Sequence, residues 1–477
     1  MRKRTETGVG SRSTAGQIAF PEGNASNAAG ETQAHGSPAS SAPPAIRSEP
    51  GRKHKWYSLI DKVYALPNLW AAWQHVKANN GAPGIDRQTI DRFTERAPER
   101  VERLSADLRR KSYRPQPVRR KLIPKSGGGQ RPLGIPTVRD RIVQQALLQV
   151  LEPIFEAKFS KRSHGFRKER GCHTALDVVD RAVRYGYQWV VDADIRAFFD
   201  TVDHDKLLSA VNEEVSDGSV LRLISQILTA GVVEPLTGDV EPTELGTPQG
   251  GPLSPLLANI YLHRFDERIV AAGCGLVRYA DDFVLFARSK DEAEQALNLA
   301  REVLEGELGL VLHPEKTRAV SVAEGFEFLG FHYFRDPKTD LTVKEVRRKS
   351  VSSFREEVRK RTPRLKTQRP VKARKVTPTR LAKNQRVREM IRSLNLYLAG
   401  WHGYFRTVWS RYPGSPFRNF DGFVRQRVRT AITGRVGPGW WHVRLSNVIL
   451  RRVGLIPLDE RQQKYHARQL AASARKG

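Results

Sequence analysis

The chain has 477 residues, and its 81 Lys or Arg against 51 Asp or Glu give a formal net charge of +30. This length allows two or three domains with an ample core, and such an excess of positive charge favours a polyanionic partner, most simply nucleic acid. The two cysteines, Cys172 and Cys274, exclude a disulfide framework and a cysteine-based zinc site, which fits a reducing compartment. No apolar run approaches the length of a membrane span and no secretory signal is present, so we expect no membrane partner.

The N-terminal stretch is rich in Ser, Ala, Gly and Pro and lacks apolar periodicity, which predicts a disordered tail over residues 1–54. The folded part begins near Trp56, and apolar residues recur at helical spacing over 60–76. Turn residues over 79–86 end this helix, and a second amphipathic helix is predicted over about 90–108.

A strand, a glycine turn and a second strand are predicted over 118–136, with Lys and Arg on both sides of the turn. A flexible hairpin with basic groups at its base could fold over a triphosphate, although most glycine-rich turns are only turns. Helices are predicted over about 139–155 and 175–185. The polar loop between them, over 163–167, contains a single His of the kind that is more often structural than catalytic.

An apolar strand is predicted within the stretch from Trp189 to Asp200. It carries carboxylates at alternate positions, so Asp192 and Asp194 are predicted to share one face. Two carboxylates at the end of a buried strand are costly unless they bind a cation, whereas at a frayed strand end they would face solvent. The loop over 246–255 has little side-chain bulk and permits close backbone approach to a ligand. A helix is predicted to follow it over 256–262.

Two adjacent aspartates interrupt the apolar stretch from Leu276 to Phe286, which predicts a β-hairpin with Asp281 and Asp282 at its tight turn. Carboxylates this close repel each other unless a cation lies between them or one is protonated, and Mg²⁺ takes oxygen ligands of this kind. An isolated Asp-Asp pair is more often an ordinary surface turn. The second acidic strand, which carries Asp194, favours the metal interpretation.

Beyond the hairpin, a helix is predicted over 292–308, a turn that presents a lysine over 312–317, and a strand over 326–331. Apolar residues recur every three or four positions over 390–408, which predicts a helix with a buried stripe and a basic flank. A charge run is usually a solvated surface, but the density of basic residues after residue 340 favours phosphate binding. The residues expected to contact RNA are Arg347, Arg348, Lys349, Arg388, Arg392, Arg406, Arg425, Arg427 and Arg429.

Three carboxylates, those of Asp194, Asp281 and Asp282, are thus expected on two neighbouring strands. Two-metal phosphoryl transfer needs such an arrangement, because one ion activates an attacking 3′-hydroxyl and the other stabilises the leaving pyrophosphate. The reaction depends mostly on positioning and charge stabilisation. Basic residues near Lys125 and Arg131 would hold the triphosphate, and the wide basic surface would hold template and primer.

The order of these blocks resembles the group II intron-encoded reverse transcriptases, or maturases. The blocks that carry the resemblance are Asn80–Asp86, Arg131–Thr137, Asp194–Ile195 with Phe199–Asp200, Thr247–Gly250, Tyr279–Asp282, Phe328–Phe331 and Leu396–Phe405. Tyr-Ala-Asp-Asp alone is only moderately specific, whereas the ordered set, which spans about residues 55–450, is highly specific.

The resemblance implies an α+β fold, namely a right-hand polymerase of fingers, palm and thumb with an antiparallel palm sheet. An α-helical maturase (thumb) domain would follow the palm. The implied domains are a disordered tail, an N-terminal extension with fingers, a palm, a maturase-specific RNA-binding domain and a basic C-terminal tail. Their expected bounds are residues 1–54, 55–185, 186–335, 336–450 and 451–477.

The resemblance also implies roles for particular residues. The catalytic and metal-binding residues would be Asp194, Asp281, Asp282 and, through its backbone carbonyl, Ile195, with two Mg²⁺ ions for which Mn²⁺ could substitute. Phe199 would be the steric gate against a ribose 2′-hydroxyl, and Lys316 a candidate general acid toward pyrophosphate. The residues that would contact the incoming nucleotide are Lys125, Arg131, Phe199, Gln249 and Lys316. Asp192 is outside the implied set of ligands, and its role stays open.

The implied function is RNA-directed DNA synthesis in the bacterial cytoplasm, at the nucleoid. The protein, as a monomer or dimer, would bind a group II intron RNA, assist its splicing and copy it into DNA during retrohoming. Its further partners would be an RNA template with a DNA primer, deoxynucleoside triphosphates and a DNA target.

Many members of this family end in a Cys-containing endonuclease domain, and because no cysteine follows Cys274, that activity is expected to be absent. Integration would then depend on pre-existing nicks, replication forks or single-stranded DNA. Two alternatives stay open. One is an RNA-binding splicing factor with little polymerase activity, and the other is a reverse transcriptase recruited to host defence or repeat acquisition.

Overall fold

The computed structural model divides the chain between two compact units. It describes residues 55–124, 129–234, 238–247, 250–365, 378–409, 416–434 and 445–474. The first unit comprises the described residues of Met1–Lys121, Leu133–Tyr187 and Ala193–Thr317, and the second those of Leu122–Pro132, Gln188–Asp192 and Arg318–Gly477. The tail predicted over 1–54 lies outside the described residues.

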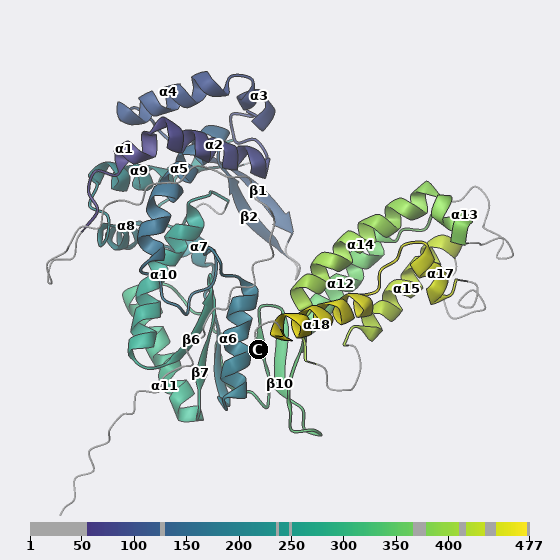
Figure 1. Ribbon diagram of the computed structural model, residues 1–477. Helices are drawn as coiled ribbons and strands as arrows, with labels where there is room; N and C mark the ends of the chain where they lie inside the picture. The colour runs from purple at the N-terminus through teal and green to yellow at the C-terminus, as the bar shows by residue number, and fades with distance from the viewer. Residues whose placement is uncertain are drawn as a thin grey trace, which may run out of the picture. The chain divides into compact units, whose positions relative to one another are not determined.

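Short helices open the first unit (Figure 1). They are α1 (Ile60–Tyr64), α2 (Leu66–Asn79), α3 (Ile90–Thr94) and α4 (Ala97–Arg109), and the longer α5 (Val138–Glu156) packs against the first two. The prediction of single helices over 60–76 and 90–108 is wrong, because each is divided in two. Ala65 is extended (ψ 129°) two residues before Pro67, and Pro98 lies at the start of α4. Proline suits the first turn of a helix and therefore marks where each second helix begins.

The two strands predicted within 118–136 are confirmed. They form a sheet of order β2-β1-β4-β5, in which β1 runs parallel to β4 with Val118 opposite Val232. The bounds are β1 (Val118–Pro124), β2 (Gln130–Ile135), β4 (Val232–Val233) and β5 (Val240–Glu241). The tip of the hairpin, over 125–128, lies outside the described residues.

A second sheet, of order β6-β7-β3-β8, contains the acidic strands. Its bounds are β3 (Trp189–Asp194), β6 (Gly275–Tyr279), β7 (Asp282–Ala287) and β8 (Arg318–Ser321), and the pairs β6–β7 and β3–β8 are antiparallel. The helices α6 (Cys172–Arg184), α10 (Ser254–Ala271) and α11 (Lys290–Arg301) pack around the β6–β7 hairpin (Figure 1). The other helices of this unit are α7 (Phe198–Thr201), α8 (His204–Asn212), α9 (Gly218–Leu228) and the π-helix η1 (Glu302–Glu307).

Helix α10 is longer than the predicted 256–262, because its second half is amphipathic rather than wholly apolar. Its outer face carries Arg264 and Arg268, which form ion pairs of 2.7 and 2.6 Å with Glu307. Its inner face stays buried through Phe265 and Ile269. The apolar run alone therefore marked only the part of the helix that is buried on all sides.

The second unit begins its own small antiparallel sheet after β8. The sheet has the order β11-β10-β9, with β9 (Phe326–Phe328), β10 (Phe331–Arg335) and β11 (Thr342–Val346). The prediction of one strand over 326–331 is wrong, because Leu329 (φ 45°) and Gly330 (φ 84°) take left-handed conformations that reverse the chain. Phe331 and Phe328 then face each other across the resulting hairpin.

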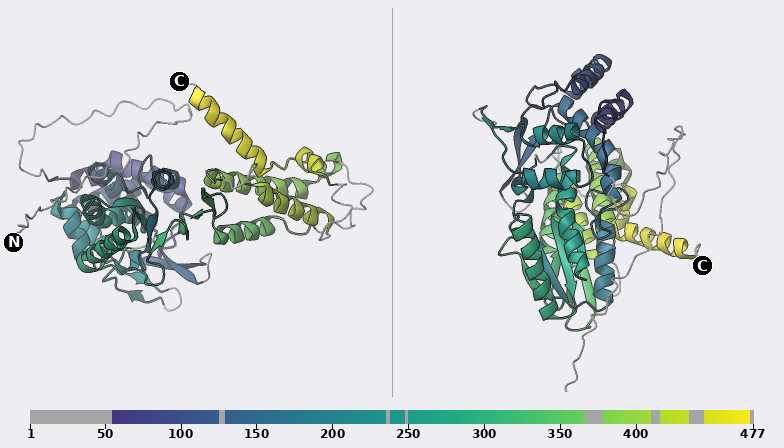
Figure 2. Two further views of the ribbon diagram at one scale, coloured as in Figure 1. Left: turned by 90° about the horizontal axis from the view of Figure 1, so that it is seen from below. Right: turned by 90° about the vertical axis from the view of Figure 1, so that its left-hand side faces the viewer.

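Helices make up the rest of the second unit (Figure 2). They are α12 (Arg348–Arg361), α13 (Pro378–Lys383), α14 (Gln385–Phe405), α15 (Arg418–Thr433), α17 (Asn447–Arg452) and α18 (Leu458–Ala474). The helix predicted over 390–408 is confirmed in α14, whose buried stripe includes Met390, Leu394 and Leu398. Phe354 of α12 anchors the aromatic core, with its ring 4.4 Å from that of Trp401. Within the described residues, no helix has the length and apolar character needed to cross a membrane.

Candidate active site

A two-residue turn joins β6 to β7. Tyr279 pairs with Asp282 across the hairpin, so Ala280 and Asp281 form the turn itself. Ala280 has φ 58°, the left-handed conformation that two-residue hairpin loops favour at their first position. A side chain makes this conformation costly, and such strain persists where the surrounding structure enforces it, most often at functional sites. The predicted hairpin is confirmed with Asp281 in its turn, whereas Asp282 is the first residue of β7.

Strand β3 is the neighbour of β7 in the sheet and ends at Asp194. Asp192 and Asp194 are half-buried, whereas Ala193 between them is buried, so the two carboxylates share one face as predicted. Because β3 and β7 are adjacent strands, the carboxylate of Asp194 and those of the turn come from neighbouring strands.

A lysine contacts the end of β3. The Nζ atom of Lys316 lies 2.5 Å from Oδ2 of Asp194, and their side chains are 58% and 31% exposed. The loop that carries the lysine is fixed by its backbone, because the amide of His313 donates to the carbonyl of Asp194 at 2.8 Å and the amide of Arg196 to that of Val311 at 2.8 Å. The predicted turn that presents Lys316 therefore directs its ammonium group at one of the predicted metal ligands.

The type of ligand in this region suits a hard divalent cation. Asp194, Asp281 and Asp282 offer carboxylate oxygens, which Mg²⁺ prefers, and the ammonium group on Asp194 shows that this carboxylate attracts positive charge. Among the described residues, however, no group of three or more His, Cys, Asp or Glu side chains is arranged to hold a metal ion. The carboxylate oxygens of these three residues are suitable ligands, and they lie on neighbouring strands. Their assignment as metal ligands, and that of the Ile195 carbonyl, stays a prediction.

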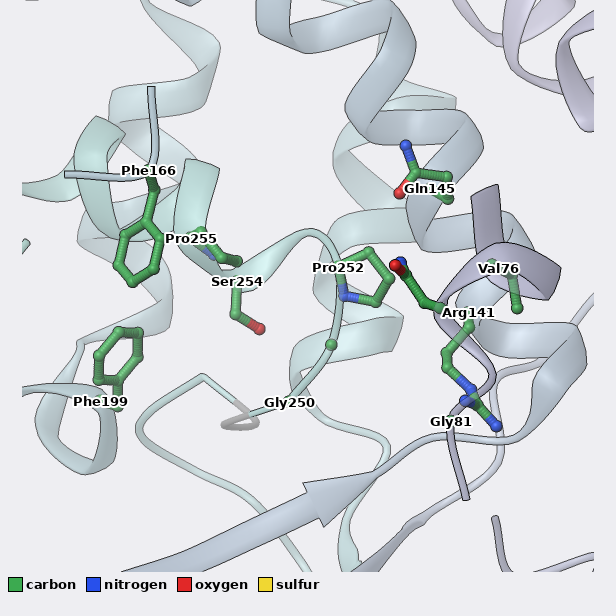
Figure 3. A pocket seen from close by; sticks show the side chains of 12 residues that line it. Val76, Gly81, Arg141, Gln145, Phe166, Phe199, Gly250, Pro252, Ser254 and Pro255 are labelled. Carbon is green, nitrogen blue, oxygen red and sulfur yellow. The ribbon is translucent and has the colours of Figure 1, made fainter. Parts of the chain in front are cut away.

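Phe198 and Phe199 follow β3 and have different environments. Phe198 is buried, 2% exposed, and its ring lies 5.2 Å from that of Phe199. Phe199 is half-buried and lines a cavity of about 510 Å³. Figure 3 shows the rings of Phe199 and Phe166 at one end of this cavity and Arg141 at the other. The side chain of Phe199 therefore limits the size of a group that can enter the cavity at this end.

The glycines of the loop over 246–255 permit close approach, but to protein backbone. A Cβ atom on Gly246 would lie 2.7 Å from the carbonyl oxygen of Phe199, and one on Gly250 would lie 2.5 Å from that of Gly134. The amide of Thr247 also donates to the Phe199 carbonyl at 2.7 Å. This loop thus packs on the backbone that carries the predicted steric gate.

Burial shifts the pKa values of two groups next to the turn in the direction that favours their neutral forms. Burial, followed by the hydrogen bond and charge of Cys172, raises the pKa of Tyr279 to about 12. Burial, followed by the positive charge of Arg170 and other nearby arginines, lowers the pKa of His164 to about 3, and its Nδ1 lies 2.9 Å from Oγ1 of Thr174. His164 is therefore a neutral structural residue, as the sequence indicated for the loop that contains it.

The predicted nucleotide contacts are distributed between described and undescribed parts of the chain. Lys125 and Gln249 lie outside the described residues, and Arg131 is an exposed residue of β2. Arg278, whose Nη1 donates to the carbonyl of Ala280 in the turn, was not among the predicted site residues. The signal for Arg278 was a charged residue inside an otherwise apolar strand.

Some of the basic residues predicted to contact RNA also have partners within the second unit. Arg427 donates to the carbonyl of Thr362 at 3.1 Å, and Arg429 donates to the carbonyl of Leu445 at 2.9 Å. Arg388 and Arg392 are exposed on α14. The remaining predicted contacts are Arg348 and Lys349 at the start of α12, Arg347 as its N-cap, Arg406 as the C-cap of α14, and Arg425 on α15. The RNA contacts of the whole set stay predictions.

Two family models match the chain. Residues 123–333 match the model described as "Reverse transcriptase (RNA-dependent DNA polymerase)", and residues 372–442 match "Group II intron, maturase-specific domain". Protein YkfC of Escherichia coli (strain K12) is 36% identical over 292 residues, which cover 53% of this chain and 76% of YkfC. The chain belongs to the group II intron reverse transcriptase and maturase family.

Other relatives match over shorter shares of their length. Group II intron-encoded protein LtrA of Lactococcus lactis subsp. cremoris is 42% identical over 222 residues, which cover 44% of this chain and 36% of LtrA. Among solved structures, a chain of a structure titled "Partial Cas6-RT-Cas1--Cas2 complex" is 27% identical to this protein. The match covers 52% of this chain and 43% of the chain in that complex. Its TM-score of 0.35 is too low to bear on function. The family confirms the predicted fold class and the reverse transcriptase domain.

Proposed function

We propose that this protein is an RNA-directed DNA polymerase whose active site is the β6–β7 turn together with the end of β3. The observation that carries the proposal is the strained turn at Ala280, which presents Asp281 and Asp282 next to the strand that ends at Asp194. Carboxylates at the ends of neighbouring strands suit nucleotidyl transfer. This reaction depends on the positioning of charged groups and needs no covalent intermediate with the protein. Divalent ions held by these carboxylates would activate the 3′-hydroxyl and stabilise the leaving pyrophosphate.

The surrounding side chains have roles that follow from their positions. Lys316 is more than half exposed, so its ammonium group can leave Asp194 and donate a proton to the departing pyrophosphate. Phe199 borders the cavity and would exclude a ribose 2′-hydroxyl by its bulk. Arg131, on β2, together with Lys125 and Gln249 would contact the triphosphate. These assignments, and the division into fingers, palm and thumb, are part of the proposal.

The proposed biological role is that of a group II intron-encoded protein. The maturase-specific match over 372–442 and the exposed arginines of α14 support binding of an intron RNA, help with its splicing, and copying of the intron into DNA during retrohoming. A protein with a net charge of +30 would hold RNA largely through phosphate contacts.

Primer extension on an RNA template tests the proposal directly. The Asp281→Asn variant should lose synthesis by about a thousandfold or more, because it removes a charge on which transition-state stabilisation depends, while its RNA affinity stays that of the wild type. Asp291→Asn, which changes an exposed aspartate in the first turn of α11, is the matched control and should synthesise normally. Wild-type synthesis by Asp281→Asn would refute the site. An inactive wild-type protein that still binds RNA would favour the splicing-factor alternative.

A further inference from the structure

A buried ion pair lies next to the β6–β7 turn and contacts its backbone. The side chains of Arg278 on β6 and Asp266 on α10 are both 0% exposed. The Nε and Nη2 atoms of Arg278 donate to the two carboxylate oxygens of Asp266 at 2.6 Å each, which is a bidentate pair. Buried ion pairs seldom stabilise a fold more than apolar side chains of the same size would. The pair therefore calls for an explanation other than stability.

The remaining donor of the guanidinium holds the turn. The Nη1 atom of Arg278 donates to the carbonyl of Ala280 at 2.9 Å and to Oδ1 of Asn259 at 3.1 Å. One planar group thus joins α10 to the residue that takes the left-handed conformation. Lysine has a single charged nitrogen and cannot reproduce this fork of fixed geometry.

A backbone strap, residues Arg162–Gly165, holds the same turn from a second direction. The amide of Arg278 donates to the carbonyl of Arg162 at 2.9 Å, and the amide of His164 donates to the carbonyl of Arg278 at 2.8 Å. A Cβ atom on Gly165 would lie 2.3 Å from the amide nitrogen of Ala280. Asn259 connects the strap to the ion pair, because its Nδ2 donates to the carbonyl of Gly165 at 2.9 Å.

We propose that Arg278 is a positioning residue of the polymerase active site, and this inference rests on the function proposed above. Its guanidinium fixes the Ala280 carbonyl, and the Ala280 conformation in turn fixes the direction in which Asp281 and Asp282 leave the turn. Asp266 neutralises the guanidinium, so the support places no net charge beneath the acidic turn. A misplacement of about 1 Å can cost a hundredfold in rate, so a support of this kind is needed for synthesis.

Two variants test the role in the full-length protein. Arg278→Lys keeps the charge opposite Asp266 but loses the fork, and the double variant Asp266→Leu with Arg278→Met removes both charges, so that no unpaired charge is buried. Both should raise the rate of amide hydrogen exchange in peptides that span residues 279–283. Both should lower kcat for primer extension about ten- to a hundredfold, with KM for deoxynucleoside triphosphates within about twofold of the wild type.

A substitution that creates a cavity beside another helix, α4, provides the matched control. Leu104 of α4 is 1% exposed, and Leu104→Ala should lower the melting temperature without altering exchange at 279–283 or kcat. Wild-type exchange at the turn and wild-type kcat in folded Arg278→Lys would overturn the inference, as would equal effects in Leu104→Ala. If Asp281→Asn proved active, the proposed function would fail, yet the exchange measurement would still decide whether Arg278 holds the turn.

Discussion

Asp217 joins the start of α1 to the start of α9, and its removal should cost more stability than the loss of an ordinary helix cap. Its Oδ2 accepts the backbone amides of Leu59 at 2.6 Å and Ile60 at 2.9 Å. Its Oδ1 accepts those of Ser219 at 2.8 Å and Val220 at 3.2 Å. One buried carboxylate thus caps α9 and holds a segment more than 150 residues earlier in the chain.

The expected loss for Asp217→Ala follows from these four bonds. A helix cap alone contributes about 1 kcal/mol. The two further bonds to a charged acceptor contribute about 1.5 kcal/mol each at the low end of their range. The free energy of unfolding should therefore fall by about 4 kcal/mol, which corresponds to nearly a thousandfold change in the unfolding equilibrium.

The same carboxylate makes stability depend on pH. Burial raises the pKa of Asp217, but the amides of Ile60, Val220, Leu59 and Ser219 outweigh burial and leave it below the usual value. A lowered pKa in the folded state means that the stabilisation is present above the unfolded pKa, near 4, and is lost as the pH falls through the folded pKa. The difference in unfolding free energy between the wild type and Asp217→Asn should accordingly shrink in acid.

Urea denaturation followed by tryptophan fluorescence measures this loss, since Trp70 and Trp73 lie in α2, next to α1. Asp203→Ala is the matched control, because the Asp203 side chain caps α8 by accepting the amide of Lys206 at 2.9 Å. The control should lose only about 1 kcal/mol. Equal losses for Asp217→Ala and Asp203→Ala would refute the reasoning that the contact with α1 adds to the cap.

Three further predictions concern activity and binding. Phe199→Val should admit ribonucleotides at least about tenfold better relative to deoxynucleotides, in a competition assay on an RNA template, because it removes bulk from the cavity wall. Lys316→Gln should lower kcat by about 10²- to 10⁴-fold with little change in KM, since it removes a proton donor, and an unchanged single-turnover rate would contradict this role. Affinity for RNA should fall by about 10³-fold or more between 50 and 200 mM salt, and binding insensitive to salt would exclude a surface of phosphate contacts.

Much of the fold could be predicted from local patterns. The hairpins at 118–136 and at Asp281, and the stripe of α14, follow from periodicity and turn residues within a single stretch. The division of the first predicted helix had a signal in Pro67, which marks a helix start. The turn at 329–330 had a signal in Gly330, a glycine inside a strand pattern. The conformation of Leu329 had none, since a leucine at φ 45° depends on tertiary packing that overrides its own preference.

The site was predictable only in part, because the contacts that hold its residues in place join positions that are distant in sequence. Motifs identified the acidic turn and Asp194, and the lysine turn at 312–317. The pairing of Lys316 with Asp194 joins positions 122 residues apart, and the bond from Asn259 to Gly165 joins positions 94 apart. Asn and Gly at such positions are common in loops and helices for other reasons, so neither residue signals its partner.

A protein with this much positive charge must keep its own cations from occupying its acidic site permanently. Two basic side chains near the predicted site, Lys316 and Arg278, pair with carboxylates in different ways. Lys316 is exposed and contacts Asp194 through a flexible side chain, so a ligand or another cation can displace it at little cost. Arg278 is buried, and its guanidinium donates to both carboxylate oxygens of Asp266. In the proposed mechanism the exposed cation therefore takes part in the reaction, whereas the buried one holds the turn in place.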